Sequence, residues 1–418
     1  MPADTHDHMT ASSPLRIPAF RRLAATYTLD ELGFSFGTVS LAILVFARTG
    51  SALATTALFL ASTFVPALIA PALTARLDRL PVRRALPALY LVEAALFAVL
   101  VAVAGSFWLP LVLLLVLADG AVAIVGRALT RAAVAAVLKP EGALDAGNKL
   151  LNVLFSLAYA TGPALGGVVV AAAGVRASLV VTSVVFALMA LTLATARTLP
   201  PASGDPDRSW VQRLREGLAY VRAHGTVRRV LTAHGAALTF AAFATPVEVV
   251  YAAESIDGGP GAYGLLLAAW GAGTVLSSVA LTRFREVPAL VLIPLGAAGT
   301  GASFLAMSAA GTLAVAMGAF VLGGAGNGIY YVSVVQALQE RIPDDLQARV
   351  MGLLESTTAG AYGLGFMIGG AIAAAADARL ALGLAGAGVL LAAAAIVALL
   401  RGDRRAAAPL AAQPEPAR

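Results

Sequence analysis

Four carboxylic acids lie near the middle of long apolar runs in this sequence of 418 residues. Asp30 and Glu31 are adjacent in the first run, Glu93 lies in the third and Asp119 in the fourth. A carboxylate is costly in an apolar environment, and two adjacent, poorly solvated carboxylates cannot easily both be ionised. These residue types therefore predict carboxyl groups that bind and release protons. Asp119 ranks second to the Asp30 and Glu31 pair, and Glu93 is either a proton carrier or a buried structural partner.

A stripe of polar residues accompanies the acidic pair. Tyr27, Glu31, Ser35 and Thr38 recur at intervals of four, four and three residues, which places them on one face of a helix. Such a stripe in an otherwise apolar helix predicts that the helix borders a water-filled substrate cavity. We expect Glu31 to carry a coupling proton and Asp30 to tune it, because one carboxyl of the pair would be protonated near neutral pH.

The elements that must position these residues are membrane helices. The sequence is 59% hydrophobic and 12% charged, with a mean hydropathy of +0.84, which excludes a water-soluble globule. It contains no cysteine, which excludes disulfides and thiolate metal sites. Apolar runs of about 20 residues predict twelve spans. They are 20–47, 53–75, 84–105, 108–128, 147–173, 177–197, 229–253, 261–282, 287–308, 311–334, 350–376 and 379–400.

The distribution of basic residues predicts the orientation of these spans. An even number of spans puts both termini on one side, and if that side is the cytoplasm, 26 of the 29 basic residues lie in tails, inner loops and the inner ends of spans. Arg48, Arg176 and Arg379 then lie outside. Because basic residues are retained on the cytoplasmic side, we expect a multi-pass protein of the cell (inner, plasma) membrane with both termini cytoplasmic. Residues 1–19 show no signal peptide.

The two halves of the sequence repeat each other. The same pattern occurs twice, 203 residues apart, as Ala158-Tyr159-x-x-Gly162-x-x-x-Gly166-Gly167 and Ala361-Tyr362-x-x-Gly365-x-x-x-Gly369-Gly370. Parallel duplication of a helix bundle is one architecture of secondary transporters. The predicted segments are a cytoplasmic tail (1–19), an N-terminal six-helix half (20–198), a cytoplasmic linker (199–228), a C-terminal six-helix half (229–400) and a disordered cytoplasmic tail (401–418).

The linker contains a predicted amphipathic helix. Ser209 and Gln212 form a capping box, and apolar residues follow at helical spacing between Arg213, Arg215 and Arg222. These charges are too dense for hydrocarbon. We therefore expect this helix to lie on the inner surface of the membrane.

The loop after the second span contains an acid that the rule for basic residues does not explain. Asp78 and Arg79 are followed by Arg83 and Arg84. These residues resemble the loop signature of the major facilitator superfamily, Gly-x-x-x-Asp-Arg-x-Gly-Arg-Arg, although the first glycine is a threonine here. The resemblance implies that Asp78 contacts the positive N-terminus of span eleven, which begins near Arg349, and stabilises one conformational state.

Span five contains Gly162, Pro163, Gly166 and Gly167. Small residues at this spacing permit close packing of helices in lipid, and the proline bends the span. Within the same superfamily, this Gly-Pro-x-x-Gly-Gly run resembles the motif of exporters that exchange substrate for protons. Glu355, near the inner end of span eleven, is predicted to act in gating.

Nearly the whole chain is similar to the twelve-span efflux branch of this superfamily, which includes macrolide-type, multidrug and siderophore exporters. The resemblance implies an all-α membrane protein in which twelve transmembrane helices form two parallel six-helix repeats, the major facilitator fold. We expect a secondary active transporter that exports a small amphiphilic molecule, a drug-like compound or a metabolite, by alternating access and proton antiport. The alternatives are a proton-coupled or passive importer of a metabolite, and a ligand-binding membrane sensor built on the same fold.

No zinc spacing, Walker motif or nucleophile elbow occurs in the sequence. The glycine-rich run 324–328 lies inside span ten with no preceding strand, so it predicts helix packing or an unwound turn that lines a cavity, rather than a nucleotide loop. His234 is expected to be an interfacial polar residue, and Glu248 a solvated residue at the outer end of span seven. We expect no enzyme activity, cofactor, metal or nucleic-acid partner; the expected partners of this monomer are a small-molecule substrate, protons and the lipid bilayer.

Overall fold

The structure is a computed structural model that describes residues 13–69, 81–195, 210–256, 258, 261–283 and 286–407. All regular structure in these residues is helical. The N-terminal half contains η1 (Pro14–Arg16), α1 (Pro18–Thr49), α2 (Ala52–Phe59), η2 (Leu60–Phe64), α4 (Val82–Val103), α5 (Leu109–Leu138) and α6 (Leu144–Ala194). The C-terminal half contains α7 (Trp210–Ala223), α8 (Gly225–Ala241), α9 (Ala244–Val250), η3 (Tyr251–Ser255), α10 (Ala262–Arg283), α11 (Ala289–Ala309), α12 (Leu313–Gln339), α13 (Asp344–Ala375) and α14 (Ala378–Ala407).

The helices are those of a membrane protein. In the described residues, eleven helical stretches are long and apolar enough to cross a membrane. The longest helix, α6, holds two of the predicted spans, because Gly174 has a non-helical backbone (φ 82°, ψ 167°) that divides it into two legs. Glycine adopts such a positive φ without a steric penalty. The prediction of an all-α membrane protein is confirmed.

Two boundaries differ from the sequence prediction or extend it. α14 continues through Ala407, past residue 401 where a disordered tail was predicted. α7 coincides with the predicted amphipathic helix, and its Glu216 forms an ion pair of 2.9 Å with Arg349 of α13. The predicted cap at Ser209 lies outside the described residues. This ion pair attaches the linker helix to the C-terminal half.

Glycines let the helices of the C-terminal half approach closely. A Cβ atom at Gly324 of α12 would overlap the carbonyl oxygen of Trp270 in α10, and one at Gly296 of α11 would lie 2.5 Å from the backbone nitrogen of Tyr330. Gly328 packs against Ser277 in the same way. The run 324–328 is therefore a packing surface within a continuous helix, which is the first of the two sequence interpretations, and not an unwound turn.

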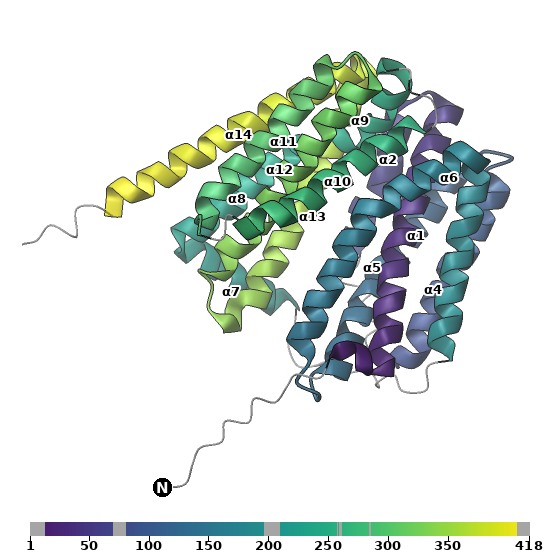
Figure 1. Cartoon of the computed structure of the whole chain (residues 1–418), viewed down its shortest axis with the longest axis horizontal. Coiled ribbons are helices and arrows are strands. Elements are labelled where there is room, and N and C mark those ends of the chain that lie inside the picture. The colour runs from purple at the N-terminus through teal and green to yellow at the C-terminus, as the bar shows by residue number, and fades with distance from the viewer. Residues whose placement is uncertain are drawn as a thin grey trace, which may run out of the picture.

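The two halves meet at one end of the bundle. We call the end where α1 starts and α14 finishes the terminal end, and the opposite end, where the halves meet, the far end. Here Gly167 of α6 lies against Gly264 of α10, and Gly370 of α13 lies against Thr56 of α2. The Phe59 and Phe366 rings, one from each half, are 5.8 Å apart. Figure 1 shows α2, α6 and α9 close together in this region and the helices diverging toward the N-terminus and α7.

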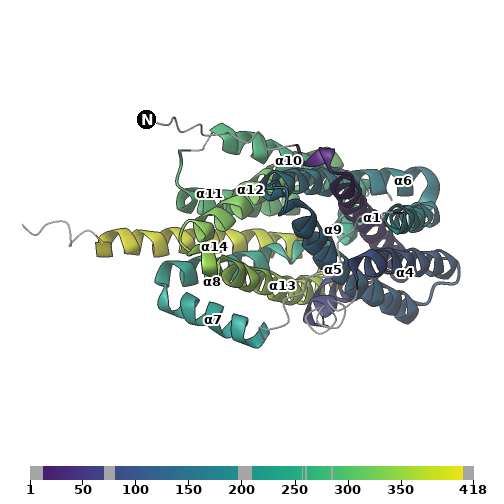
Figure 2. The same cartoon turned by 90° about the horizontal axis from the view of Figure 1, so that it is seen from below.

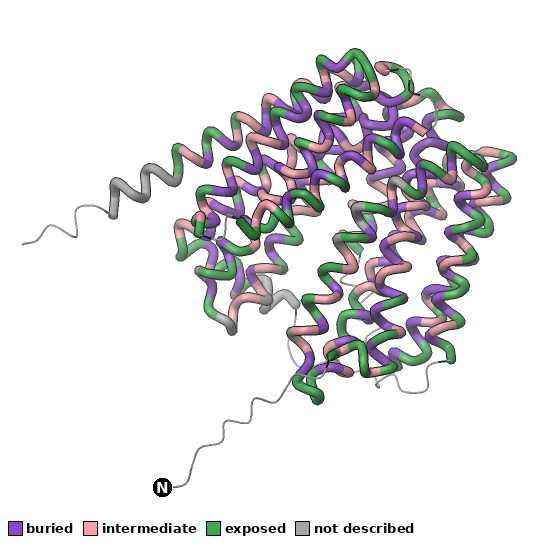
Figure 3. Tube along the Cα trace, viewed as in Figure 1, coloured by how far each residue is buried: buried purple, intermediate pink, exposed green. Residues whose placement is uncertain are grey.

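The outer surface of the bundle is apolar. Figure 2 shows the two halves side by side, with α1, α4, α5 and α6 in one and α8, α11, α12 and α14 in the other. Figure 3 shows exposed positions along the outer flanks of these helices. The exposed residues of the chain include Leu91, Leu188 and Leu391, which are 60%, 52% and 70% exposed. Leucines in these positions suit contact with lipid.

Candidate functional site

The most unusual cluster of side chains joins α1 to α5. The Arg127 Nη1 atom lies 3.7 Å from a Glu31 carboxylate oxygen and 4.0 Å from an Asp30 carboxylate oxygen. One turn closer to the terminal end, Arg131 donates a hydrogen bond of 3.3 Å to the Tyr27 hydroxyl. A step of four residues forward in α1 is matched by a step of four back in α5, as expected of antiparallel neighbours. The two helices thus form a short ladder of polar contacts.

Arg127 is placed between the buried acids and a more open side. The side chains of Asp30 and Glu31 are only 4% and 6% exposed, whereas that of Arg127 is 27% exposed. Its guanidinium group also lies over the Phe34 ring, 5.1 Å from the ring centre. This contact is attractive, because an aromatic face draws a cation. Arg127 therefore covers the two acids and remains partly accessible.

Two more acids belong to the same cluster. Glu93 of α4 and Asp119 of α5 are 1% and 9% exposed, and both lie close enough to Asp30 and Arg127 for electrostatic interaction. Among the described residues, neither Glu93 carboxyl oxygen has a hydrogen-bond partner, and one oxygen each of Asp30 and Asp119 also lacks one. The structure places Glu93 with the other acids, where it could serve in either of its two predicted roles, proton carrier or buried structural partner. An ionised carboxylate without a partner is strongly disfavoured at such a place.

The sequence interpretation missed Arg127 and Arg131. The fourth span was predicted to end at residue 128, so Arg127 stood at its last turn and Arg131 beyond it, and both were counted with the basic residues of the cytoplasmic side. In the structure α5 continues to Leu138, so both arginines lie within the helix. Their spacing of four residues, the same as that of Tyr27 and Glu31, is the signal that could have revealed them.

The predicted polar stripe divides into two parts. Tyr27 and Glu31 contact the arginines of α5, whereas Ser35 is buried against Gly162 of α6, and Thr38 is partly buried. A Cβ atom at Gly162 would lie 2.7 Å from the Ser35 side chain. The end of the stripe nearer the far end is therefore a helix-packing surface rather than a cavity wall.

The glycines of span five have different neighbours. A Cβ atom at Gly166 would lie 3.3 Å from the Phe36 backbone in α1, whereas Gly167 faces Gly264 in the other half. Pro163 lies inside the helix between them and Gly162. The motif thus joins α6 to its own half and to the opposite half at once.

The predicted gating loop is only partly described. Asp78 and Arg79 lie outside the described residues, so their implied contact with span eleven stays a prediction. Arg83 and Arg84 are exposed and line a hollow of about 450 Å³ with Pro87 and Ala194, at the terminal end of α4 and α6. Arg349, at the start of that span, is paired with Glu216.

The C-terminal half has a buried, hydrogen-bonded cluster around His234. His234 is 1% exposed, and its two ring nitrogens lie 3.1 Å from the hydroxyl oxygens of Tyr330 and Thr358. The expectation of an interfacial histidine was wrong, because α8 buries it against α12 and α13. Glu248 was also misassigned as solvated, since α9 buries it to 8% exposure. Glu355 is exposed on α13 and lies close enough to Tyr331 of α12 for electrostatic interaction.

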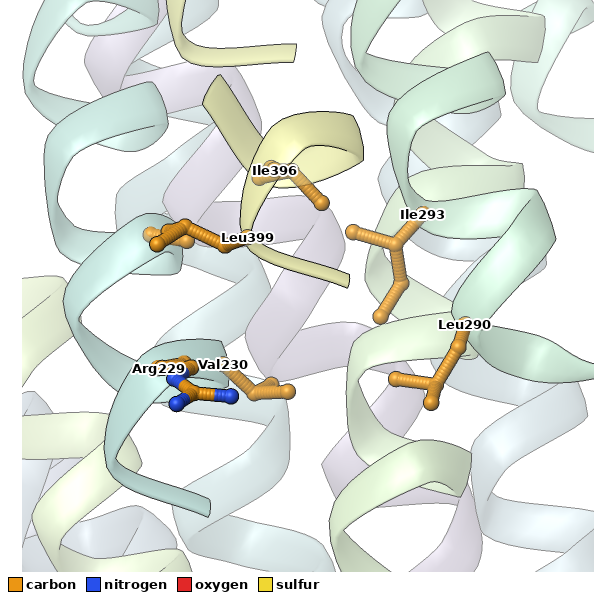
Figure 4. Close-up of a pocket in the computed structure, with 7 residues that line it drawn as sticks. Arg229, Val230, Leu290, Ile293, Ile396 and Leu399 are labelled. Carbon is orange, nitrogen blue, oxygen red and sulfur yellow. The ribbon is translucent and has the colours of Figure 1, made fainter. Parts of the chain in front are cut away.

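A small crevice lies between α8, α11 and α14 at the terminal end. Its residues belong to the C-terminal half, whereas the charged cluster belongs to the N-terminal half. Figure 4 shows its lining by Arg229, Val230, Leu290, Ile293, Ile396 and Leu399. Arg229 is the basic side chain of this otherwise apolar lining. Such a surface resembles the boundary between lipid chains and headgroups rather than a polar binding site.

Comparison with known proteins supports the assignment to a transporter family. Residues 9–417 match the family described as Transmembrane secretion effector. The uncharacterized MFS-type transporter YfiS of Bacillus subtilis (strain 168) is 26% identical over 248 residues, which cover 56% of this chain and 59% of YfiS. The aligned part is thus less than two thirds of that relative.

Solved transporter structures share the fold. The nucleoside transporter NupG matches with a TM-score of 0.73 at 11% identity and covers 92% of this chain and 99% of NupG. A bacterial homologue of the iron transporter ferroportin in an inward-facing state matches with a TM-score of 0.69 at 16% identity, over 92% of this chain and 98% of that one. At these identities the likeness shows the fold alone. The match over residues 9–417 shows more: the chain belongs to the Transmembrane secretion effector family of MFS-type membrane transporters.

Proposed function

We propose that the protein exports a small amphiphilic molecule in exchange for protons, by alternating access. The observation that carries the proposal is the cluster of Asp30, Glu31, Glu93 and Asp119 around Arg127. Four ionised carboxylates around one guanidinium group would leave a large excess of negative charge in a buried region, at a cost that the protein can avoid by binding protons. The cluster is therefore suited to reversible protonation.

The proton would act by weakening the electrostatic attraction between Arg127 and the acids. When Glu31 and Asp30 are ionised, their carboxylates attract the guanidinium group and join α5 to α1. When one of them takes up a proton, that attraction weakens, and Arg127 is freer to turn toward the space between the halves. Proton binding can thus change the contact between two helices that surround the route of the substrate.

The contacts between the halves support an inward-open state. The described contacts of Gly167 with Gly264 and of Thr56 with Gly370 join the two halves at the far end. With the orientation expected from the basic residues, the far end faces outside and the terminal end faces the cytoplasm. A substrate would then enter from the cytoplasm, and separation of the far end would release it outside.

The proposed direction of transport, export, is supported by two observations. The family is described by secretion, and the run Gly162-Pro163-x-x-Gly166-Gly167 resembles a motif of proton-exchanging exporters. An importer of a metabolite would use the same cluster in the reverse direction. A sensor would bind the ligand without moving it.

Reconstitution into lipid vesicles with a pH-sensitive dye inside tests these functions together. A panel of amphiphilic compounds is supplied on one face, and both compound and protons are followed. We expect compound movement against its gradient, coupled to proton movement in the opposite direction. Proton movement in the same direction as the compound would indicate an importer, and saturable binding with no flux of any panel compound would support the sensor. Flux with no response to the proton gradient would remove proton coupling.

A further inference from the structure

The wall of the C-terminal half that faces the N-terminal half carries an acid with no cation beside it. Glu355 is exposed, and it forms no ion pair among the described residues. It lies six residues beyond Arg349, where the membrane-crossing part of α13 begins, and so about 9 Å along the helix from that point. A carboxylate at this depth needs a compensating charge or good solvation.

Aromatic side chains surround this carboxylate. Tyr331 of α12 is 43% exposed, and Tyr362 lies two turns further along α13. Both tyrosines lie close enough to Glu355 for electrostatic interaction. The Tyr362 ring stacks on Phe366 at 5.5 Å, and Phe366 is 5.8 Å from Phe59 of the other half. The rings thus continue from the acid toward the closed far end. Aromatic faces beside a carboxylate attract cations, and they also suit an apolar body.

The opposite wall is positively charged. Arg131 of α5 is exposed and acts electrostatically on Tyr331 across the interface between the halves. Arg127, one turn further along, already compensates Asp30 and Glu31. A cation that enters between the halves is therefore repelled by α5 and attracted by Glu355, the acid that no basic residue compensates.

We propose that Glu355, Tyr331 and Tyr362 form a subsite for the protonated amine of an amphiphilic substrate. The carboxylate accepts hydrogen bonds from the ammonium group, the tyrosine rings flank it, and the apolar part of the molecule extends along the aromatic series toward the far end. This inference rests on the proposed function, because it names the chemical class of the exported molecule. It assigns substrate binding to the C-terminal half and proton binding to the N-terminal half.

The test is equilibrium binding to the purified full-length chain in lipid nanodiscs, without any gradient. The probe is dansylcadaverine, a fluorescent amphiphile with a primary amine, and its N-acetyl derivative is the uncharged control. We expect the wild type to bind the amine at least ten times more tightly than the acetylated compound. Glu355→Gln should weaken amine binding about tenfold and leave the acetylated compound unchanged. Glu355→Asp should retain a preference for the amine, and Tyr331→Phe should weaken it severalfold.

Glu340→Gln is the matched control, because Glu340 is an exposed glutamate at the end of α12 that pairs with Arg341. It should bind both probes as the wild type does. The subsite is overturned if the wild type does not prefer the amine, or if Glu355→Gln binds it normally, as a solvated residue or a gate between the halves would. Because no gradient is present in the binding test, its result does not depend on whether transport is coupled to protons. In a separate flux measurement, normal proton-coupled flux of the amine by Glu355→Gln would contradict the subsite but not the proposed function.

Discussion

The Arg127 guanidinium group lies 3.7 Å from Glu31 while 27% of the Arg127 side chain remains exposed. This relationship gives the same carboxylate two competing partners, an arginine on the neighbouring helix and a proton. Since Arg127 belongs to α5 and Glu31 to α1, exchange of one partner for the other alters the contact between two helices. In the proposed mechanism, coupling between proton binding and conformation would follow from this competition.

Glu31→Gln removes the charge and imitates the protonated carboxyl permanently. We expect this variant to bind substrate, to lose uphill export driven by protons and to retain downhill exchange, because exchange requires no net proton transfer. Asp30→Asn should weaken coupling less, since the Asp30 oxygen is 4.0 Å from Arg127. Transport in proteoliposomes with and without an imposed proton gradient measures both. Uphill export at the normal rate in both variants would move the role to Asp119.

Arg127→Gln leaves the acids without their compensating charge. Removal of one partner of a buried ion pair costs about 3–5 kcal/mol, and the partial exposure of Arg127 places the expected loss at or below the lower end of that range. We expect a lower unfolding temperature in detergent, measured by loss of the monodisperse peak after heating. The double variant with Glu31→Gln should recover part of the loss, because one uncompensated acid is gone. Additive losses in the double variant would show that the two residues do not interact.

The sequence predicted the helical membrane fold and the acids of the cluster but not how the acids are compensated. The hydropathy of each run follows directly from residue types, so the helices could be identified one at a time. The partner of Glu31 depends on which helix lies beside α1 and on the length of α5, and neither can be read from a single run. Arg131 was assigned to a loop because the predicted span ended three residues before it, whereas α5 continues to Leu138.

In the C-terminal half, too, contacts between helices could not be predicted from single apolar runs. His234 and Glu248 have the residue types of exposed positions, and only the packing of α8 and α9 against their neighbours buries them. The helix break at Gly174 and the dense glycines of α12 were readable, because glycine has a local effect on the backbone and on close approach. Local chemistry was therefore predictable, and contacts between distant helices were not.

The orientation of the chain can be measured directly. A reporter fused after Arg222 should show cytoplasmic activity, and one inserted between Asp257 and Gly261 should show external activity. The physical reason is the 26 to 3 division of the 29 basic residues. A pair of enzymes active only inside or only outside the cell provides the measurement. The opposite activity at either position would reverse the proposed direction of opening.

Gly167→Val should prevent the halves from closing at the far end. Its Cβ atom would overlap the Gly264 backbone, whereas a Cβ atom at Gly360 of α13 would meet nothing within 4 Å. Gly360→Val is therefore a control with the same change of residue in a helix. In both backgrounds a single cysteine at Thr56, which is 4% exposed, reports opening through its labelling by a membrane-impermeant maleimide. We expect severalfold faster labelling with Gly167→Val, and equal rates would show that this contact does not control closure.

A disulfide across the far end should hold the protein in the inward-open state. A Cβ atom at Gly261 would lie 3.1 Å from the Ala171 Cβ atom of the other half, and disulfides need about 3.5–4.5 Å between Cβ atoms. A small shift would therefore allow Ala171→Cys and Gly261→Cys to bond.

The wild-type chain has no cysteine, so this pair would be unique. Oxidation should stop transport, a reductant should restore it, and binding of ligand from the cytoplasmic side should persist, because only the far end is held closed. Each single cysteine variant under the same oxidant is the control. If the double variant is crosslinked, as shown by mass spectrometry, and still transports at the normal rate, the halves do not need to separate at Ala171 and Gly261, and release of substrate at the far end is wrong.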